Sequence, residues 1–250
     1  MDLEFNQPFD FQDGTGAEVV PECPFEIMQV GLVKLDSSFN IREMMELNIR
    51  PSIYKRIHPF VGRITGITHR DLYTEAQSFP QSFDEITGFI ESSENIFAVW
   101  GGSDVKLLFK NILYHGLPTS GIPTNFIDVQ ALAGRRLNAS SGMSVGLKNA
   151  VTTLGIEQDR PFHNALSDAL YTAQIFNIVR GAETSLEKYI KGISSDSGSR
   201  SRKEKNLPYD TAALYHEAEK LFGRKLSSSQ KKIVRKIYEM GMIEKFSSRT

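Results

Sequence analysis

The stretch RPFHNALSDALYTAQIF, residues 160–176, places a histidine and a carboxylate five positions apart at the start of an apolar-striped segment. On a continuous helix, His163 and Asp168 would be separated by about 140° of rotation and about 7.5 Å of rise, so their side chains would point apart. Pro161 disfavours helical geometry at the residue before it, and apolar residues recur at helical spacing only farther along. The sequence therefore predicts that His163 lies in a loop and that a helix begins near Asn164, which lets the imidazole and the carboxylate meet.

Taken alone, this pair is equally consistent with an ordinary solvent-exposed helix start, so the rest of the chain must decide. Asp2 and Glu4 open the sequence on either side of Leu3, and alternate residues of a strand face the same side. Neighbouring carboxylates repel unless a cation lies between them, and hard oxygen ligands suit Mg²⁺ or Mn²⁺. An acid-x-acid triplet is common, and without partners a solvated terminus would explain it as well.

Strand and helix signals alternate through the body of the chain. Residues 25–35, FEIMQVGLVKL, predict a strand covered on both faces, and residues 95–100 predict a short apolar strand. Ser103 can cap the following helix, with Asp104 in its first turn, where ordinary helix-start chemistry is the simplest explanation of an isolated acid. Further elements are predicted as strands at 39–50 and 126–129 and as helices starting near 80 and spanning 144–154. This order predicts an α/β fold, a mixed sheet covered by helices.

Composition sets the remaining limits. The chain has 250 residues and one cysteine, Cys23, which excludes an internal disulfide and fits a reducing compartment. No apolar run approaches the length needed to span a membrane, and the N-terminus lacks a secretion signal, so we expect no membrane association and a cytoplasmic location. The five histidines show no paired spacing with each other or with Cys23, which argues against a zinc enzyme.

The charge distribution divides the chain into an acidic body and a basic tail. Residues 197–250 hold 13 Lys+Arg against 6 Asp+Glu, a net charge of +7, and the remainder carries −8. We therefore expect a domain over 1–193, a polar low-complexity linker over 194–206 and a basic helical hairpin over 207–250. The tail side chains expected to meet phosphate are Lys231, Lys232, Arg235 and Lys236. A solvated basic face on a hairpin that docks or dimerises is an equally good interpretation.

Several motifs together, spread over residues 1–180, resemble the DEDDh 3′-to-5′ exonucleases. They are the Asp2-x-Glu4 triplet, PFEIMQVGLVKLD, ITGIT followed by SFPQSF, AVWGGSD and HNALSDA. Their details look most like the Eri-type branch, which includes histone-mRNA and small-RNA 3′-end exonucleases and the bacterial KapD-like proteins. The resemblance implies a ribonuclease-H-like fold, with a mixed five-stranded sheet flanked by helices and here a C-terminal helical appendage.

The resemblance also implies the chemistry. Two divalent ions, Mg²⁺ or Mn²⁺, would be held by Asp2, Glu4, Asp104 and Asp168, and His163 would take the proton from the attacking water. Leu3 and Phe5, beside the first acids, are candidates for contact with the terminal nucleotide, although core burial is the better expectation for Leu3.

The implied reaction is 3′-to-5′ exonucleolytic release of nucleoside 5′-monophosphates from single-stranded RNA ends or short oligonucleotides. The preference for RNA over DNA rests only on the branch likeness. Two alternatives remain open. One is a DNA-trimming or proofreading-type exonuclease, and the other is a weakly catalytic nucleic-acid-binding protein that functions through its basic tail. The sequence leaves the oligomeric state undetermined.

Overall fold

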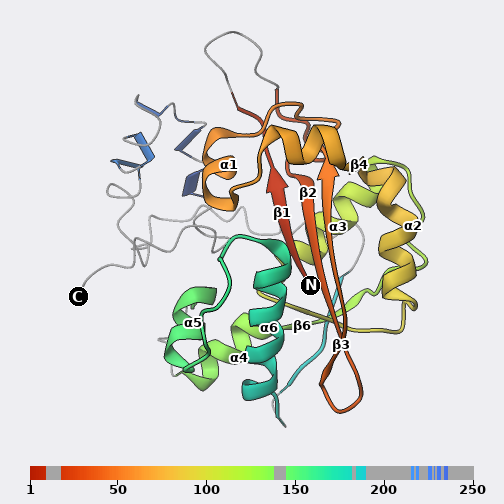
Figure 1. Cartoon of the computed structure of the whole chain (residues 1–250), viewed down its shortest axis with the longest axis vertical. Helices are drawn as coiled ribbons and strands as arrows, with labels where there is room; N and C mark the ends of the chain where they lie inside the picture. The colour runs from red at the N-terminus through yellow and green to blue at the C-terminus, as the bar shows by residue number, and fades with distance from the viewer. Residues whose placement is uncertain are drawn as a thin grey trace, which may run out of the picture.

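The computed structural model describes residues 1–9, 18–137, 145–181 and 184–189, together with residues 215, 216, 218, 219, 225, 226, 228, 230, 231, 234 and 235. Three antiparallel strands form its centre: β1 (Asp2–Asn6), β2 (Glu26–Leu35) and β3 (Ile41–Arg50). β1 pairs with the first part of β2, from Asp2 opposite Gly31 to Asn6 opposite Glu26, and its register shifts between Glu4 and Phe5. Figure 1 shows the three strands side by side.

A second ladder continues from this centre. β5 (Phe97–Val99) pairs in parallel with β6 (Asn125–Asp128), which pairs with the two-residue strand β7 (Glu187–Lys188). The amino group of Met1 donates to the carbonyl oxygen of Ala98 at 2.9 Å, so the start of β1 meets β5. The two-residue strand β4 (Gln77–Ser78) pairs with the end of β3. The predicted α/β fold is confirmed, and the described strands form a ladder of four and a ladder of three rather than one five-stranded sheet.

Helices cover both faces of these strands. α2 (Phe79–Ile90) and α3 (Ser103–Tyr114) share a core with side chains of β1 and β2, whereas α4 (Val129–Arg136), α5 (Leu147–Thr153) and α6 (Ala165–Val179) enclose a second core with β6. Two short helical segments, α1 (Pro59–Thr65) and the π-helix η1 (Asp71–Glu75), lie in the connection after β3. α6 packs directly on β2 and β1, and this packing brings its first turn to the candidate site.

Local sequence signals account for most helix ends. α6 begins after Asn164, whose side chain accepts a hydrogen bond from the Ser167 N–H at 2.9 Å, as expected of an N-cap. Asp128 caps α4 in the same way, and Gly155 adopts a left-handed φ of 67° after α5. The expectation for Ser103 was wrong by one position, because Gly102 occupies the N-cap and Ser103 is the first helical residue.

Two buried polar side chains anchor the segment after β3. The Glu26 carboxylate accepts hydrogen bonds from the backbone N–H groups of residues 52, 53 and 54, which compensates for the burial of its charge. Asn6 donates to the carbonyl oxygens of Tyr54 and Arg56 and accepts from the N–H of His58. These bonds hold the segment that leads into α1 against the ends of β1 and β2.

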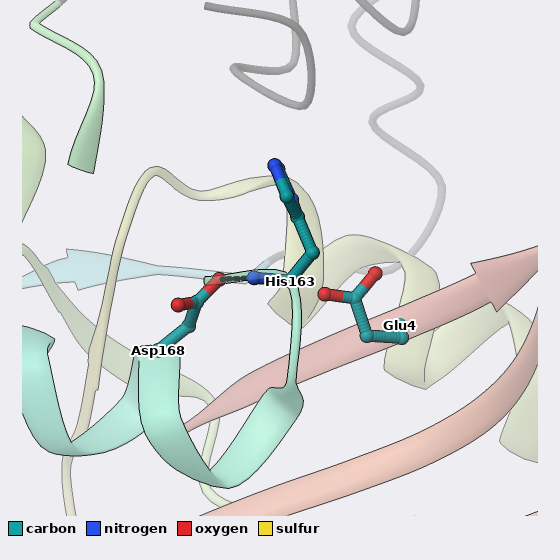
Figure 2. Close-up of side chains that lie close together, drawn as sticks. All are labelled: Glu4, His163 and Asp168. Atoms are coloured by element: carbon teal, nitrogen blue, oxygen red, sulfur yellow. Dashed lines mark hydrogen bonds between the residues drawn. The ribbon is translucent and has the colours of Figure 1, made fainter. Parts of the chain in front are cut away.

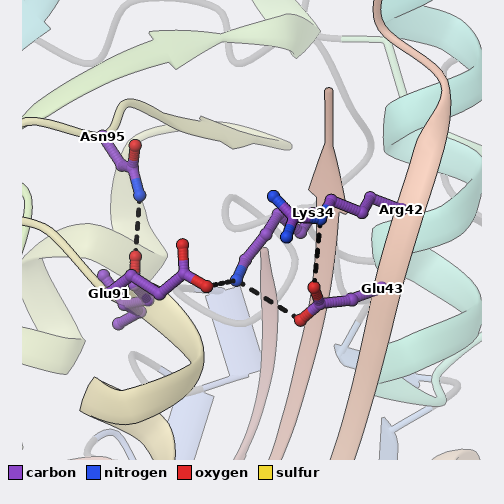
Figure 3. Close-up of polar contacts among 6 residues, drawn as sticks. Lys34, Arg42, Glu43, Glu91 and Asn95 are labelled. Atoms are coloured by element: carbon purple, nitrogen blue, oxygen red, sulfur yellow. Dashed lines mark hydrogen bonds and ion pairs between the residues drawn. The ribbon is translucent and has the colours of Figure 1, made fainter. Parts of the chain in front are cut away.

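An ion-pair cluster lies at the opposite end of β2 (Figure 3). Lys34 Nζ is 2.8 Å from Glu91 Oε1 and 3.4 Å from Glu43 Oε2, and Arg42 Nε is 3.2 Å from Glu43 Oε1. It borders a cavity of about 610 Å³ lined by none of the predicted site residues. The apolar members of the lining include Met1, Leu32, Phe89, Ile96, Phe97 and Ala173.

The predicted linker at 194–206 lies outside the described residues. Of the tail predicted at 207–250, only the eleven separate residues given above are described. The division into a domain, a linker and a helical hairpin therefore stays a prediction.

Candidate active site

β1 presents the first two acids on one face. Glu4 is buried, with 4% of its surface exposed, and Asp2 is half-buried one alternation earlier on the same side. Leu3 points the other way into the core beneath α2 and α3. Pairing with β2 fixes this orientation, because a slip of one residue would exchange the faces of the strand.

The third acid comes from the turn between β5 and α3. Gly101 adopts a φ of 86°, a conformation that favours glycine, and Gly102 approaches the ring of Phe126 so closely that an added Cβ would lie 3.0 Å from it. This tight turn brings the first turn of α3 over β1, where the Asp104 carboxylate accepts a hydrogen bond from the backbone N–H of Leu3. Asp104 is thereby joined directly to the strand that carries Asp2 and Glu4.

The fourth acid and the histidine come from the start of α6. His163 lies in the loop before the helix, with a left-handed φ of 63°, and its backbone N–H donates to Asp168 Oδ2 at 3.1 Å. This loop position, followed by a helix capped by Asn164, agrees with the sequence prediction. This hydrogen bond to Asp168 comes from the backbone of His163, and a ring nitrogen of the imidazole lies within 4.8 Å of a carboxylate oxygen of Asp168.

These elements converge on one point. Glu4, His163 and Asp168 each offer a ligand atom within 4.8 Å of the others. Figure 2 shows the Glu4 and Asp168 carboxylates on the two sides of the His163 backbone, with the histidine ring extending beyond them. Asp2 and Asp104 lie outside that tight group but interact with it electrostatically. The structure thus gathers all five predicted residues in one region.

The electrostatics of the acids reflect this crowding. Burial, followed by repulsion from Asp104, Asp168 and Glu4, raises the pKa of Asp2 well above its ordinary value of 3.8, and the Met1 ammonium opposes the shift. Burial and then repulsion from Asp168 and Asp104 likewise raise the pKa of Glu4 well above 4.5. Burial raises the pKa of Asp104 to about 7.

Such a cluster suits divalent cations. Buried carboxylates that repel one another are destabilised when ionised, and a cation among them removes that penalty. All four acids supply hard oxygen ligands of the kind that Mg²⁺ and Mn²⁺ prefer. The donor set and its electrostatics therefore fit bound divalent ions.

Comparison with known families decides the assignment. The RNase T family model, described as Exonuclease, matches residues 12–176, which is more than half of the chain. The chain belongs to the RNase T exonuclease family. The match contains Asp104, His163 and Asp168 and begins after Asp2 and Glu4. No curated protein sequence matches this exonuclease chain.

Solved structures support the same fold. The nuclease domain of 3′hExo, a DEDDh family member bound to rAMP, is 20% identical, with a TM-score of 0.61 over 76% of this chain and 94% of that chain. A 3′-exonuclease in 3′-end specific recognition of a histone mRNA stem-loop is 19% identical, with a TM-score of 0.60 over 76% and 88%. Cell-death related nuclease 4 (CRN-4) is 14% identical, with a TM-score of 0.58 over 74% and 64%. The predicted exonuclease family is confirmed, and the Eri-type branch stays a prediction.

Two predicted substrate contacts of the exonuclease have a different role. Leu3 and Phe5 are 2% and 3% exposed and belong to the core shared with α2 and α3. They lie on either side of Glu4 in the strand, and both side chains pack into this core. Their side chains therefore serve packing, in contrast to the predicted contact with a terminal nucleotide.

The basic tail residues are described only in part. Lys231 Nζ lies 3.5 Å from Glu219 Oε1 and 5.4 Å from the centre of the Tyr215 ring, and Arg235 is exposed. Lys232 and Lys236 lie outside the described residues. Within the described residues, no helix of the exonuclease is long and apolar enough to cross a membrane.

Residues that support the site were harder to predict than those that form it. An added Cβ on Gly31 would lie 2.1 Å from the backbone carbonyl of Ala165, so only glycine lets α6 approach β2 this closely. A glycine inside a strand is a recognised signal for such an approach. Gln29 faces α6 two residues earlier and accepts a hydrogen bond from the Ala165 N–H at 2.8 Å. Nothing in the sequence alone assigns a partner to that amide.

The raised pKa values predict how stability depends on pH and cations. A folded state that holds protons more tightly than the unfolded chain loses stability as the pH rises from the ordinary value, 3.8 for Asp104, through the folded value of about 7. A cation that neutralises the acids removes this loss, so the Mn²⁺-induced rise in Tm should grow between about pH 5 and about pH 8. At a cation concentration about 100-fold above Kd we expect a rise of about 5 °C or more.

Differential scanning fluorimetry with and without MnCl₂ measures this rise. Buried histidines also make stability depend on pH, because their lowered pKa values destabilise the folded protein at acidic pH. The difference in Tm between the scans with and without MnCl₂ removes this contribution and reports on the acids. Asp104→Asn is the matched variant and should show a smaller cation-induced rise. A rise that is the same at every pH would contradict the interpretation.

Proposed function

We propose that this chain is a metal-dependent 3′-to-5′ exonuclease that releases nucleoside 5′-monophosphates from single-stranded RNA ends or short oligonucleotides. The observation that carries the proposal is the convergence of Asp2, Glu4, Asp104 and Asp168 beside His163 in a chain of an exonuclease family. Water would be the nucleophile, and the 3′-terminal phosphodiester bond would be the one that breaks.

The four acids would hold two Mg²⁺ or Mn²⁺ ions. When bound, these ions activate the attacking water and stabilise negative charge on the phosphoryl group and the leaving oxygen. The carboxylates come from three separate elements, β1, α3 and α6, each tied to the next by a backbone hydrogen bond or by direct packing. The protein thereby holds its ligands in place before any ion arrives, which lowers the cost of assembling the site.

His163 would act as the general base. Burial, with a smaller contribution from Lys148, lowers the pKa of its imidazole below 6.5, so the ring is neutral at pH 7 and able to accept a proton. Its ring extends beyond the two nearest carboxylates, as Figure 2 shows, and the residue is partly exposed. The lysine that contributes to the shift lies near the start of α5.

The direction of digestion and the preference for RNA come from similarity. Two neighbours, each matched over 76% of this chain, are a 3′-exonuclease in 3′-end specific recognition of a histone mRNA stem-loop and a nuclease domain bound to rAMP. Both descriptions favour digestion from the 3′ end and a ribonucleotide substrate. They agree with the Eri-type resemblance of the motifs.

The basic tail would add sequence-independent attraction for phosphate. Deleting residues 197–250 should weaken oligonucleotide binding and flatten its dependence on salt, because each phosphate contact to a single strand contributes a slope of about 0.7 in log–log units. Fluorescence anisotropy with a labelled oligonucleotide at several salt concentrations measures both quantities. If affinity and slope are unchanged by the deletion, the tail serves docking or partner binding instead.

Digestion of labelled substrates tests the proposal as a whole. A 5′-labelled single-stranded RNA and its DNA counterpart are incubated with Mg²⁺, with Mn²⁺ or with a chelator. We expect the RNA to shorten progressively from its 3′ end only when a divalent cation is present. Faster shortening of the DNA would favour the DNA-trimming alternative, and binding without shortening would favour the weakly catalytic binding protein.

A further inference from the structure

Gln29 lies in the middle of β2 and connects three elements through one side chain. It is 4% exposed. Its Oε1 accepts from the backbone N–H of Ala165 at 2.8 Å, and its Nε2 donates to Glu46 Oε1 at 3.2 Å and to Asn48 Oδ1 at 3.0 Å. One amide therefore joins β2, β3 and the first residue of α6.

Glu46 provides a second connection between β3 and the start of α6. Its Oε1 accepts from Nδ2 of Asn164 as well as from Gln29. Asn164 also caps α6 through its Oδ1. The two residues that follow His163 are thus both fixed to the sheet, one through Glu46 and the other through Gln29.

His163 needs this support because of its backbone conformation. A φ of 63° is unfavourable for a residue with a Cβ and persists where the surroundings impose it. On one side the His163 N–H is held by Asp168 at 3.1 Å, and on the other side positions 164 and 165 are held by the sheet. The direction of the imidazole depends on this backbone, since χ1 starts from its Cα.

We infer that Gln29, together with Glu46, is a positioning residue that sets the orientation of the His163 base. The inference rests on the proposed function of His163. Gln29 lies opposite Glu4 in the pairing of β1 with β2, and its hydrogen bonds go to Ala165, Glu46 and Asn48. Its effect on His163 therefore passes through the backbone at 164 and 165. Its loss should misplace the imidazole, while the backbone pairing of β1 with β2 keeps Asp2 and Glu4 in place.

Gln29→Leu and the matched control Asn111→Leu test this role. Asn111 is a buried amide of α3 that accepts from the N–H of Ile27 in β2 and donates to the carbonyl of Phe25, just before β2. Both variants lose a buried amide and should lower Tm. Only Gln29→Leu should lower kcat, by about 10- to 100-fold for a displaced catalytic group, with KM and the Kd for Mn²⁺ unchanged.

Exchanging the two side chains gives a rescue. Gln29→Glu alone places a second carboxylate against Glu46 and should lower kcat as Gln29→Leu does. In the double variant Gln29→Glu with Glu46→Gln, residue 29 still accepts from the Ala165 N–H, and residue 46 donates to residue 29 while accepting from Asn164. Residue 29 faces Glu4 as well as Glu46, so we expect the double variant to recover kcat relative to Gln29→Glu alone, where residue 29 meets a carboxylate on both sides. Glu46→Ala, at an exposed position, covers the case in which Gln29→Leu does not fold, and should also lower kcat.

The imidazole can also be observed without an activity assay. In ¹³C-histidine-labelled protein at pH 8, the His163 ring signal should be sharp in the wild type and in Asn111→Leu, and shifted or broadened in Gln29→Leu. The inference fails if the ring signal and kcat of Gln29→Leu and Glu46→Ala match those of Asn111→Leu, or if the exchange gives no recovery. If the wild type digests no oligonucleotide, the proposed function fails, and the ring signal still decides whether Gln29 positions His163.

Discussion

Replacing His163 with alanine should lower kcat by about 10²- to 10⁴-fold, the contribution typical of a general base. The affinity for Mn²⁺ should stay unchanged, because the proposed ligands of the ions are the four acids. His163 approaches Glu4 and Asp168 within 4.8 Å, so a role as a metal ligand is the direct alternative. Steady-state kinetics combined with calorimetric Mn²⁺ titration separates the two roles.

His69→Ala is the control for this substitution. His69 is exposed and stacks on Tyr73 at 4.1 Å between ring centres, in the connection before α2. Its loss removes an imidazole without touching the acid cluster, so kcat should be unchanged. A parallel loss of Mn²⁺ affinity and activity in His163→Ala would show that the histidine is a ligand, and the assignment of the base would then be wrong.

Gly31→Ala should disable the enzyme from a position that offers no functional group. The new Cβ would lie 2.1 Å from the carbonyl carbon and oxygen of Ala165 and 2.4 Å from the nitrogen of Leu166, all of them backbone atoms. α6 must therefore move away from β2, carrying His163 and Asp168 with it. We expect a loss of about 1–3 kcal/mol in the free energy of unfolding, as in other overpacked interiors. A displacement of about 1 Å at the site should lower kcat about 100-fold.

Urea denaturation and kinetics measure the two effects. The control is Gly88→Ala in α2, where an added Cβ meets nothing within 4 Å and replaces glycine in a helix, a change worth up to about 1 kcal/mol of stabilisation. That variant should be fully active and at least as stable as the wild type. Normal activity and stability in Gly31→Ala would mean that α6 does not need its close approach to β2.

The sequence predicted the chemical groups better than their supports. Pro161 and the apolar spacing after it placed His163 before the helix, and the alternation of β1 placed Asp2 and Glu4 on one face, because these are local rules of backbone geometry. Leu3 and Phe5 were predicted to contact a terminal nucleotide, with core burial preferred only for Leu3, whereas both side chains are buried in the core. The helix α1 was not predicted, since its seven residues include a proline and a glycine and show little periodicity.

The positions of Gln29 and Glu46 could not be derived in this way. Their hydrogen bonds join residues 118 or more positions apart in two cases, those to Asn164 and Ala165, and depend on how α6 packs on β2 and β3. Asp104 was recognised only through motif order, because an acid in a first helical turn has a sufficient local explanation. Its bond to the N–H of Leu3, which ties it to the other acids, is a tertiary contact.

The position of bound ions tests the account most directly. Crystals grown with MnCl₂ and measured near the manganese absorption edge should show two anomalous peaks, with oxygens of Asp2, Glu4, Asp104 and Asp168 within about 2.5 Å of at least one of them. The His163 imidazole should ligate neither ion. The account is contradicted if these carboxylates hold no manganese, or if an imidazole nitrogen of His163 is a ligand of the metal.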